Sequence, residues 1–86
     1  MNVKLFCVLD NKLSQFNTPM AFQSQGLAFR AFQDEVNREA AGNPMFKYPE
    51  DFSLHYVGEF DTVVGCFIPP SKGIPEVVAL AREVKL

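Results

Sequence analysis

The chain has 86 residues, a length that allows one domain over residues 1–86 and leaves no room for a second. A composition of 48% hydrophobic and 21% charged residues excludes a disordered tail or a low-complexity linker. Eight Lys and Arg against ten Asp and Glu give a net charge of −2, which excludes a protein that coats nucleic acid by bulk electrostatics. No apolar run reaches the roughly 20 residues of a bilayer span, and nothing resembles a secretory signal, so we expect a cytosolic domain without a membrane partner.

The N-terminal part of the sequence predicts one strand with two short partners. Val3–Leu9 is an apolar run with β-branched and aromatic residues, and it ends at the turn residues Asp10–Lys12. Leu13–Phe16 can return as a hairpin partner, and Met20–Gln23 can add a short edge segment. Because apolar residues occupy both parities of the first strand, we expect both of its faces to be covered, as in a central strand or at a subunit contact.

An amphipathic helix is predicted over about residues 24–41, because apolar residues recur there at every fourth position. These positions are Ala28, Phe32, Val36 and Ala40. Ser24 is the expected N-cap, and Gly42–Pro44 is the expected stop. Arg30 and Asp34 are four residues apart, so an ion pair within the helix is one interpretation of Arg30.

The connection over residues 43–52 carries two prolines and three aromatic residues, a composition that indicates an ordered loop held on the domain. Two further strands are predicted at Ser53–Phe60 and Thr62–Ile68. In the first of them, Leu54, Tyr56 and Phe60 are expected on one face. Gly58 then indicates a bulge or a close contact with the helix.

The C-terminal segment, Pro75–Leu86, fits two structures. Val77, Leu80 and Val84 suit a helical stripe with Pro75 in the first turn, yet the valines also suit an edge strand. We favour a second helix. The expected architecture is an α+β domain, in which a small antiparallel sheet packs on one amphipathic helix.

No group of residues predicts catalysis. Cys7 and Cys66 lie in apolar segments and are interpreted as buried, reduced thiols, with a disulfide or a metal site as the alternatives. His55 is the only histidine and is interpreted as a structural or surface residue. The glycines form no phosphate-binding motif, and no nucleophile has a readable basic partner. We therefore expect no enzyme, no catalytic residue, no cofactor and no metal.

Cations beside aromatic residues are the candidates for a contact with single-stranded nucleic acid, which is held by phosphate pairing and base stacking. Lys47 lies between Phe46 and Tyr48, Arg30 follows an aromatic residue, and Lys12 lies in the first turn. In this interpretation Arg30 pairs with a phosphate, and Phe46 or Tyr48 offers a stacking face. The alternative is that each is a surface cation beside a core aromatic residue.

Three segments together resemble a known family. They are the strand Lys4–Lys12, the Arg-x-Phe-x-Asp-x-Val-Asn run at Arg30–Asn37, and the Pro-Glu-Asp-aromatic-x-Leu…Gly-x-Phe-Asp run at Pro49–Asp61. The chain resembles the small nonstructural protein of microviruses, the single-stranded DNA bacteriophages, and in particular of the gokushovirus type. The resemblance implies a nonenzymatic DNA-binding accessory protein in the switch from double-stranded to single-stranded viral genome synthesis and packaging, in the cytoplasm of the bacterial host. It implies no individual binding residues.

The acidic balance restricts how such a protein could bind single-stranded DNA. It requires one focused basic patch, or a homodimer that doubles a weak one. The alternative is a protein-interaction module that docks on phage replication or capsid-assembly proteins and does not bind DNA.

Overall fold

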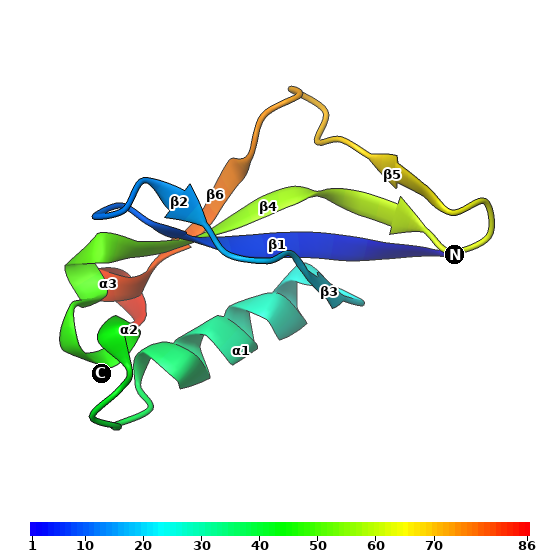
Figure 1. Cartoon of the computed structure of the whole chain (residues 1–86). Coiled ribbons are helices and arrows are strands. Elements are labelled where there is room, and N and C mark those ends of the chain that lie inside the picture. The colour runs from blue at the N-terminus through cyan, green and yellow to red at the C-terminus, as the bar shows by residue number, and fades with distance from the viewer.

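Two long strands, β1 (Asn2–Asp10) and β4 (Phe52–Asp61), pair antiparallel at the centre of the sheet in the computed structural model, which describes residues 1–86 (Figure 1). Two short strands pair with the outer edge of each long strand, and every pair is antiparallel. Those on β1 are β2 (Gln15–Phe16) and β3 (Met20–Phe22), and those on β4 are β5 (Cys66–Ile68) and β6 (Glu76–Leu80). The predicted α+β class with an antiparallel sheet is confirmed.

The strand predicted over Thr62–Ile68 is shorter than expected, because its first residues form a turn. The Asp61 carboxylate accepts hydrogen bonds from the Val63 and Val64 amides at 2.9 and 3.3 Å. Gly65 follows with φ at 74°, a left-handed conformation that glycine adopts without strain. The strand predicted over Thr62–Ile68 therefore contains only β5.

A bulge in β4 changes which side chains share a face. Leu5 pairs with Gly58 whereas Phe6 pairs with Tyr56, so Val57 is an extra residue in β4. Beyond the bulge the alternation is reversed, and Phe60 lies on the face opposite that of Tyr56. The prediction that Leu54, Tyr56 and Phe60 share one face is therefore wrong for Phe60.

Gly58 lies at this bulge with φ at 130°. A Cβ atom there would collide with the carbonyl oxygen of Ile68 in β5. The predicted bulge is confirmed, but the close approach is to a neighbouring strand and not to the helix.

The main helix, α1 (Gln25–Val36), packs on one face of the sheet. It begins as predicted at Ser24, whose hydroxyl accepts a hydrogen bond from the Leu27 amide at 3.2 Å. It ends at Asn37, several residues before the predicted position 41. The Asn37 amide group donates to the carbonyls of Gln33 and Val84 at 2.9 and 3.0 Å, and so replaces the next turn of the helix. The main buried side chains between α1 and the sheet are Phe6, Val8, Phe32, Val36, Phe52 and Leu54.

The C-terminal segment contains both structures that its sequence allowed. Residues 76–80 form β6, and a single turn, α3 (Ala81–Val84), follows it. The favoured helix is confirmed only for this last turn, because pairing with β4 holds the valine-rich part extended. Ala81 and Val84 are buried against the core.

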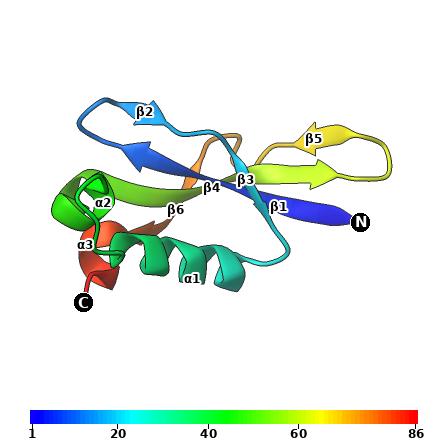
Figure 2. The same ribbon diagram turned by 60° about the horizontal axis from the view of Figure 1, so that its bottom comes forward.

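The connection between α1 and β4 is ordered as α2 (Pro44–Lys47) and the short 3₁₀ helix η1 (Pro49–Asp51). Figures 1 and 2 show α2, α3 and the C-terminus together at one end of the molecule. We call this end, with η1 and the β1–β2 turn, the helical end. No helix is long and apolar enough to cross a membrane.

The opposite end of the sheet extends beyond α1 and gives the molecule its length of 41 Å against a width of about 22 Å. It consists of β5, the turn that precedes it and the end of β4. We call residues 61–70 the β5 arm. α1 lies on one side of the β1–β4 pair, and no helix lies on the other side (Figure 1).

Gly58→Ala should destabilise the domain by roughly 2–3 kcal/mol, because the new methyl group combines a backbone collision with an unfavourable φ. Urea unfolding followed by circular dichroism measures the change. Gly42→Ala is the matched control, since a Cβ atom there meets nothing within 4 Å. Equal stability of the two variants would contradict the proposed role of the bulge.

Candidate nucleic-acid interface and an uncharged sheet face

The helical end brings together several of the residues predicted to contact nucleic acid. The Asn11 backbone and side-chain amides both donate to the Asp51 carbonyl, at 2.8 and 3.1 Å. This contact docks the β1–β2 turn, which carries the exposed Lys12, on η1. Lys47 and Tyr48 immediately precede η1 in the chain and are also exposed. Residues distant in sequence thus lie on one end of the fold.

Arg30 does not belong to this group. It lies exposed in the middle of α1 and makes no ion pair. The predicted pair with Asp34 is absent, so this interpretation of Arg30 is wrong.

The aromatic residues beside Lys47 differ in how much of each ring is free. The Lys85 ammonium lies 3.2 Å from the ring centroid of the half-buried Phe46, in a cation–π contact. One face of that ring is therefore occupied. Tyr48 is 52% exposed and offers the free stacking surface. Of the two predicted stacking residues, the structure favours Tyr48.

Two further cations at the helical end were missed by the sequence interpretation. α3 carries Arg82, which lines a shallow pocket of about 150 Å³ with Asn11 and Glu50, and it ends at Lys85. The only sign of these two cations in the sequence was their presence in the C-terminal segment. They could not be assigned to the candidate site without knowing that this segment returns to α2.

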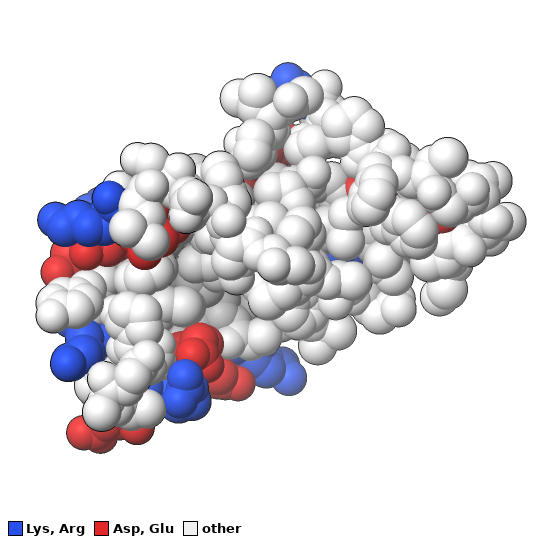
Figure 3. Space-filling view, in the orientation of Figure 1, with Lys and Arg blue, Asp and Glu red and all other residues white.

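Acidic side chains are mixed with these cations. Figure 3 shows blue and red atoms together at the helical end, whereas the β5 arm is almost entirely white. Two cations are paired with carboxylates: Arg38, beside the start of α2, with Glu35 at 2.7 Å, and Lys4 with Glu59 at 3.7 Å. The hydrogen bond from Arg38 lowers the pKa of Glu35 below its usual value. The helical end therefore carries both signs of charge and is not a broad basic surface.

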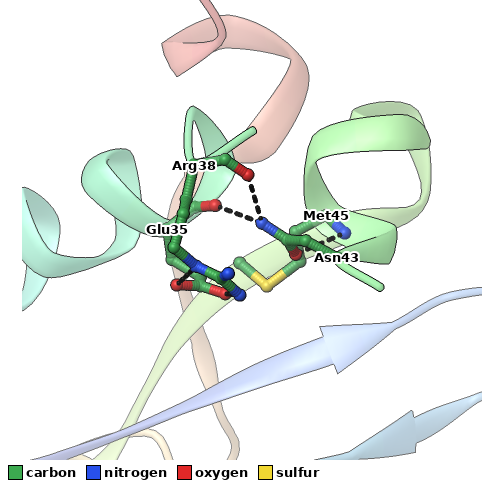
Figure 4. A network of polar contacts seen from close by, with 4 residues as sticks. All are labelled: Glu35, Arg38, Asn43 and Met45. Carbon is green, nitrogen blue, oxygen red and sulfur yellow. Dashed lines mark hydrogen bonds and ion pairs between the residues drawn. The ribbon is translucent and has the colours of Figure 1, made fainter. Parts of the chain in front are cut away.

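One buried asparagine fixes the position of α2 relative to α1 (Figure 4). The Asn43 side chain, 2% exposed, donates to the carbonyls of Glu35 and Arg38 at 2.8 and 2.9 Å. Its oxygen accepts a hydrogen bond from the Met45 amide at 3.1 Å, which caps α2. Asn43 thereby satisfies backbone groups at the end of one helix and the start of the next.

An apolar pocket of about 230 Å³ lies between α1 and the sheet. Its polar lining residues are already engaged, since Asn17 accepts a hydrogen bond from the Val8 amide at 2.7 Å and Glu35 pairs with Arg38. No free polar group remains there to orient a ligand.

The face of the sheet that points away from α1 has no charged residue. The strands contain five charged residues, and all of them lie on the face that contacts α1. Strand pairing and the alternation of side chains along each strand place them there. They are Lys4, Asp10, Glu59, Asp61 and Glu76. The opposite side, which we call the uncharged face, follows from the same register. It consists of Val3, Leu5, Cys7, Leu9, Phe16, Ala21, Ser53, His55, Phe60, Phe67, Val77 and Leu80.

Polar and thiol groups meet at the centre of the uncharged face. The Ser53 hydroxyl lies 2.9 Å from His55 Nε2, and Cys7 pairs with His55 across the strands. The Phe16 ring packs edge-on at 5.2 Å from the His55 ring, whose Nδ1 has no partner. Burial lowers the pKa of His55 and raises the pKa of the Cys7 thiol, so both groups are held neutral. The sequence interpretation missed Ser53 as the partner of the histidine.

Both cysteines are free thiols, but only Cys7 is buried as predicted. Cys66 is exposed on β5, so the prediction of burial is wrong for this residue. The strand that carries it has no second layer over it.

Comparison with known proteins identifies the family. Residues 3–84 match the family described as Phage ORF5 protein, and the chain belongs to this family. It is 31% identical over 80 residues to Protein ORF5 of Chlamydia phage 1, an alignment that covers 91% of this chain and 83% of that protein. The resemblance to a small protein of gokushovirus-type microviruses is thereby confirmed. No solved structure matches significantly.

The stability of the domain should fall as the pH is lowered from 6.5 to 5. Because burial lowers the pKa of His55, the unfolded chain binds a proton in this range that the folded chain does not. The decrease cannot exceed about 1.4 kcal/mol per pH unit, the limit set by one proton. Urea unfolding at several pH values measures it. His55→Gln should flatten the dependence above pH 5, and an unchanged slope in this variant would refute the assignment to His55.

Asn43→Ala should cost roughly 2–3 kcal/mol of stability, because three backbone groups are left without their partner at a buried position. Thermal unfolding measures the change. Asn11→Ala, at an exposed asparagine that also donates to a backbone carbonyl, is the control and should cost less than about 1 kcal/mol. A cost no larger than that of the control would show that Asn43 does not hold the two helices.

Proposed function

We propose that this Phage ORF5 family protein is a nonenzymatic, nonstructural accessory protein that binds single-stranded DNA in the switch from double-stranded to single-stranded viral genome synthesis and packaging. The observation that supports the proposal is the meeting of cations and a free aromatic ring at the helical end. Lys12, Lys47 and Lys85 come from three separate segments, and Tyr48 lies exposed beside them.

The proposed contact uses two kinds of interaction. Lys47 and Lys12 pair with phosphates, while the Tyr48 ring stacks on a base, a contact worth roughly 1–3 kcal/mol. Lys85 holds Phe46 in place through the cation–π contact and adds positive charge. Glu50 and Asp51, on the adjacent η1, repel phosphates that lie further along the strand. The proposal is therefore a short, salt-sensitive contact and not continuous coating of DNA.

A second candidate function is a protein-interaction module that docks on phage replication or capsid-assembly proteins. The mixture of both signs at the helical end favours it, because alternating charges suit a complementary protein surface. In this case the helical end binds a partner of matching charge pattern and does not bind DNA.

The DNA-binding proposal predicts weak binding of a fluorescein-labelled oligothymidine at low ionic strength. Fluorescence anisotropy measures the affinity, whose logarithm should fall with the logarithm of salt concentration by about 0.7 for each phosphate that a lysine neutralises. The double variant Lys47→Ala, Tyr48→Ala should bind at least about tenfold more weakly, since it removes one charge pair and one stacking interaction. Arg30→Ala should change the affinity less, because Arg30 lies apart from the helical end.

Lys72→Ala is the matched control, since Lys72 is exposed in the loop between β5 and β6, away from the helical end. An equal drop in affinity in this variant and in the double variant would indicate unspecific attraction and reject the proposed site. If no oligonucleotide binds at low ionic strength, the DNA proposal fails and the protein-interaction module remains.

A further inference from the structure

The β5 arm and the outer parts of the uncharged face are exposed, whereas the centre of that face, at Cys7, Ser53 and His55, is buried within the chain. The chain between β5 and β6 arches over the side of the sheet away from α1, as Figures 1 and 2 both show. Apolar side chains on the outer parts of this surface are strongly exposed; they are Phe16, Val63, Val64, Phe67, Ile74 and Val77. Lys72 is the only charged residue between positions 62 and 75.

The exposed apolar area of these six side chains, summed over the outer parts of this surface, is large for a monomer. A fully exposed aromatic side chain has roughly 150–250 Å², and valine or isoleucine somewhat less, so these side chains present on the order of 700 Å². The largest apolar patch of a typical monomer is about 300–600 Å². A stable interface needs about 800 Å² from each partner, which this surface nearly supplies before its half-exposed residues are added.

We propose that a second copy of this chain covers the uncharged face and the β5 arm. A two-fold interface sets each surface patch against itself or its close neighbours, so any charge in the patch would face a like charge. The register of β4 leaves no charge on this face. The face therefore presents no like-charge repulsion to its own copy.

The same features exclude nucleic acid as the occupant of this surface. Single strands are held by cations that pair with phosphates, together with stacking rings. Phe16 and Phe67 offer rings, but no cation lies on the uncharged face, and Lys72 is at the tip of the adjoining loop. A partner that brings only apolar surface fits better.

A second copy would also complete a small core. Only 16 of 86 residues are buried within one chain, and the first strand has apolar residues on both faces. Val3, Leu5 and Leu9 remain half-exposed on the uncharged face. Covering them adds a second apolar layer to the sheet. α2 and α3 lie on the α1 side of the sheet, away from this surface, so a copy docked on it leaves these two helices free (Figure 1).

Light scattering during size-exclusion chromatography of the full chain tests the proposal. At micromolar concentrations the wild type should have twice the chain mass of 9.7 kDa. Phe67→Asp and Val77→Asp should each give a mass of 9.7 kDa, because a two-fold interface would then bury unpaired carboxylates. Both side chains are largely exposed, at 74% and 63%, so the variants retain the core of the monomer, and far-UV circular dichroism verifies the fold.

Leu27→Asp is the control, since Leu27 is an exposed apolar residue on α1, outside the proposed interface, and this variant should keep the doubled mass. A wild type of 9.7 kDa would overturn the proposal and leave the surface to a different apolar protein. A doubled mass that persists in both Phe67→Asp and Val77→Asp would overturn it as well. The light-scattering test uses the protein without DNA, so its outcome does not depend on the oligonucleotide test. Either proposal can therefore be rejected while the other stands.

Discussion

The antiparallel pairing of β1 with β4 is the constraint on which the rest of the structure depends. Every other strand is held by one of these two, and α1 packs on the face that they create. The extra residue in β4, Val57, moves the following residues to the other face of the sheet. Glu59 and Asp61 therefore point to the same side as Lys4, whereas Phe60 joins the opposite side. The distribution of charge over the whole domain follows from this one shift in register.

This distribution separates two surfaces of different chemistry. The helical end combines both signs of charge with an exposed tyrosine, whereas the uncharged face carries no charge and the β5 arm is mostly apolar. The net charge of −2 is a sum over the whole chain and does not show that the charges are unevenly distributed between these surfaces. Because the two surfaces lie on different parts of the domain, the contact proposed for one does not depend on the contact proposed for the other.

Local patterns in the sequence were sufficient for the elements that depend on neighbouring residues. The first strand, the two short strands after it and the Ser24 cap were predicted correctly, since turn residues and side-chain spacing determine them. The end of α1 was predicted too late because Asn37 bonds to Val84, a partner that no local pattern reveals. β6 exists because β4 pairs with it, and the Val57 bulge depends on the facing strand. Each of these errors arose because the local structure depends on a contact with residues distant in the sequence.

The candidate site could be predicted only in part, because some of its residues meet through contacts between distant segments. Lys47 and Tyr48 are adjacent in sequence and were found by composition, and Lys12 joins them because Asn11 docks on Asp51. Lys85 could be assigned only once the tail was known to return to Phe46. Arg30 was grouped with them on composition alone, and the fold places it elsewhere.

The central pairing also has a consequence for how the chain reaches its structure. β1 ends at Asp10 and β4 begins at Phe52, so the two strands meet only after a loop that contains α1 and both short helices has closed. The hairpins on either side are local and form early, whereas closure of this loop has an entropic cost before any contact between β1 and β4 offsets it. During synthesis the first strand, apolar on both faces, has no β4 to pair with until residues 52–61 have been made. The pairing of β1 with β4 is therefore the strand contact with the largest loop-closure cost in this fold.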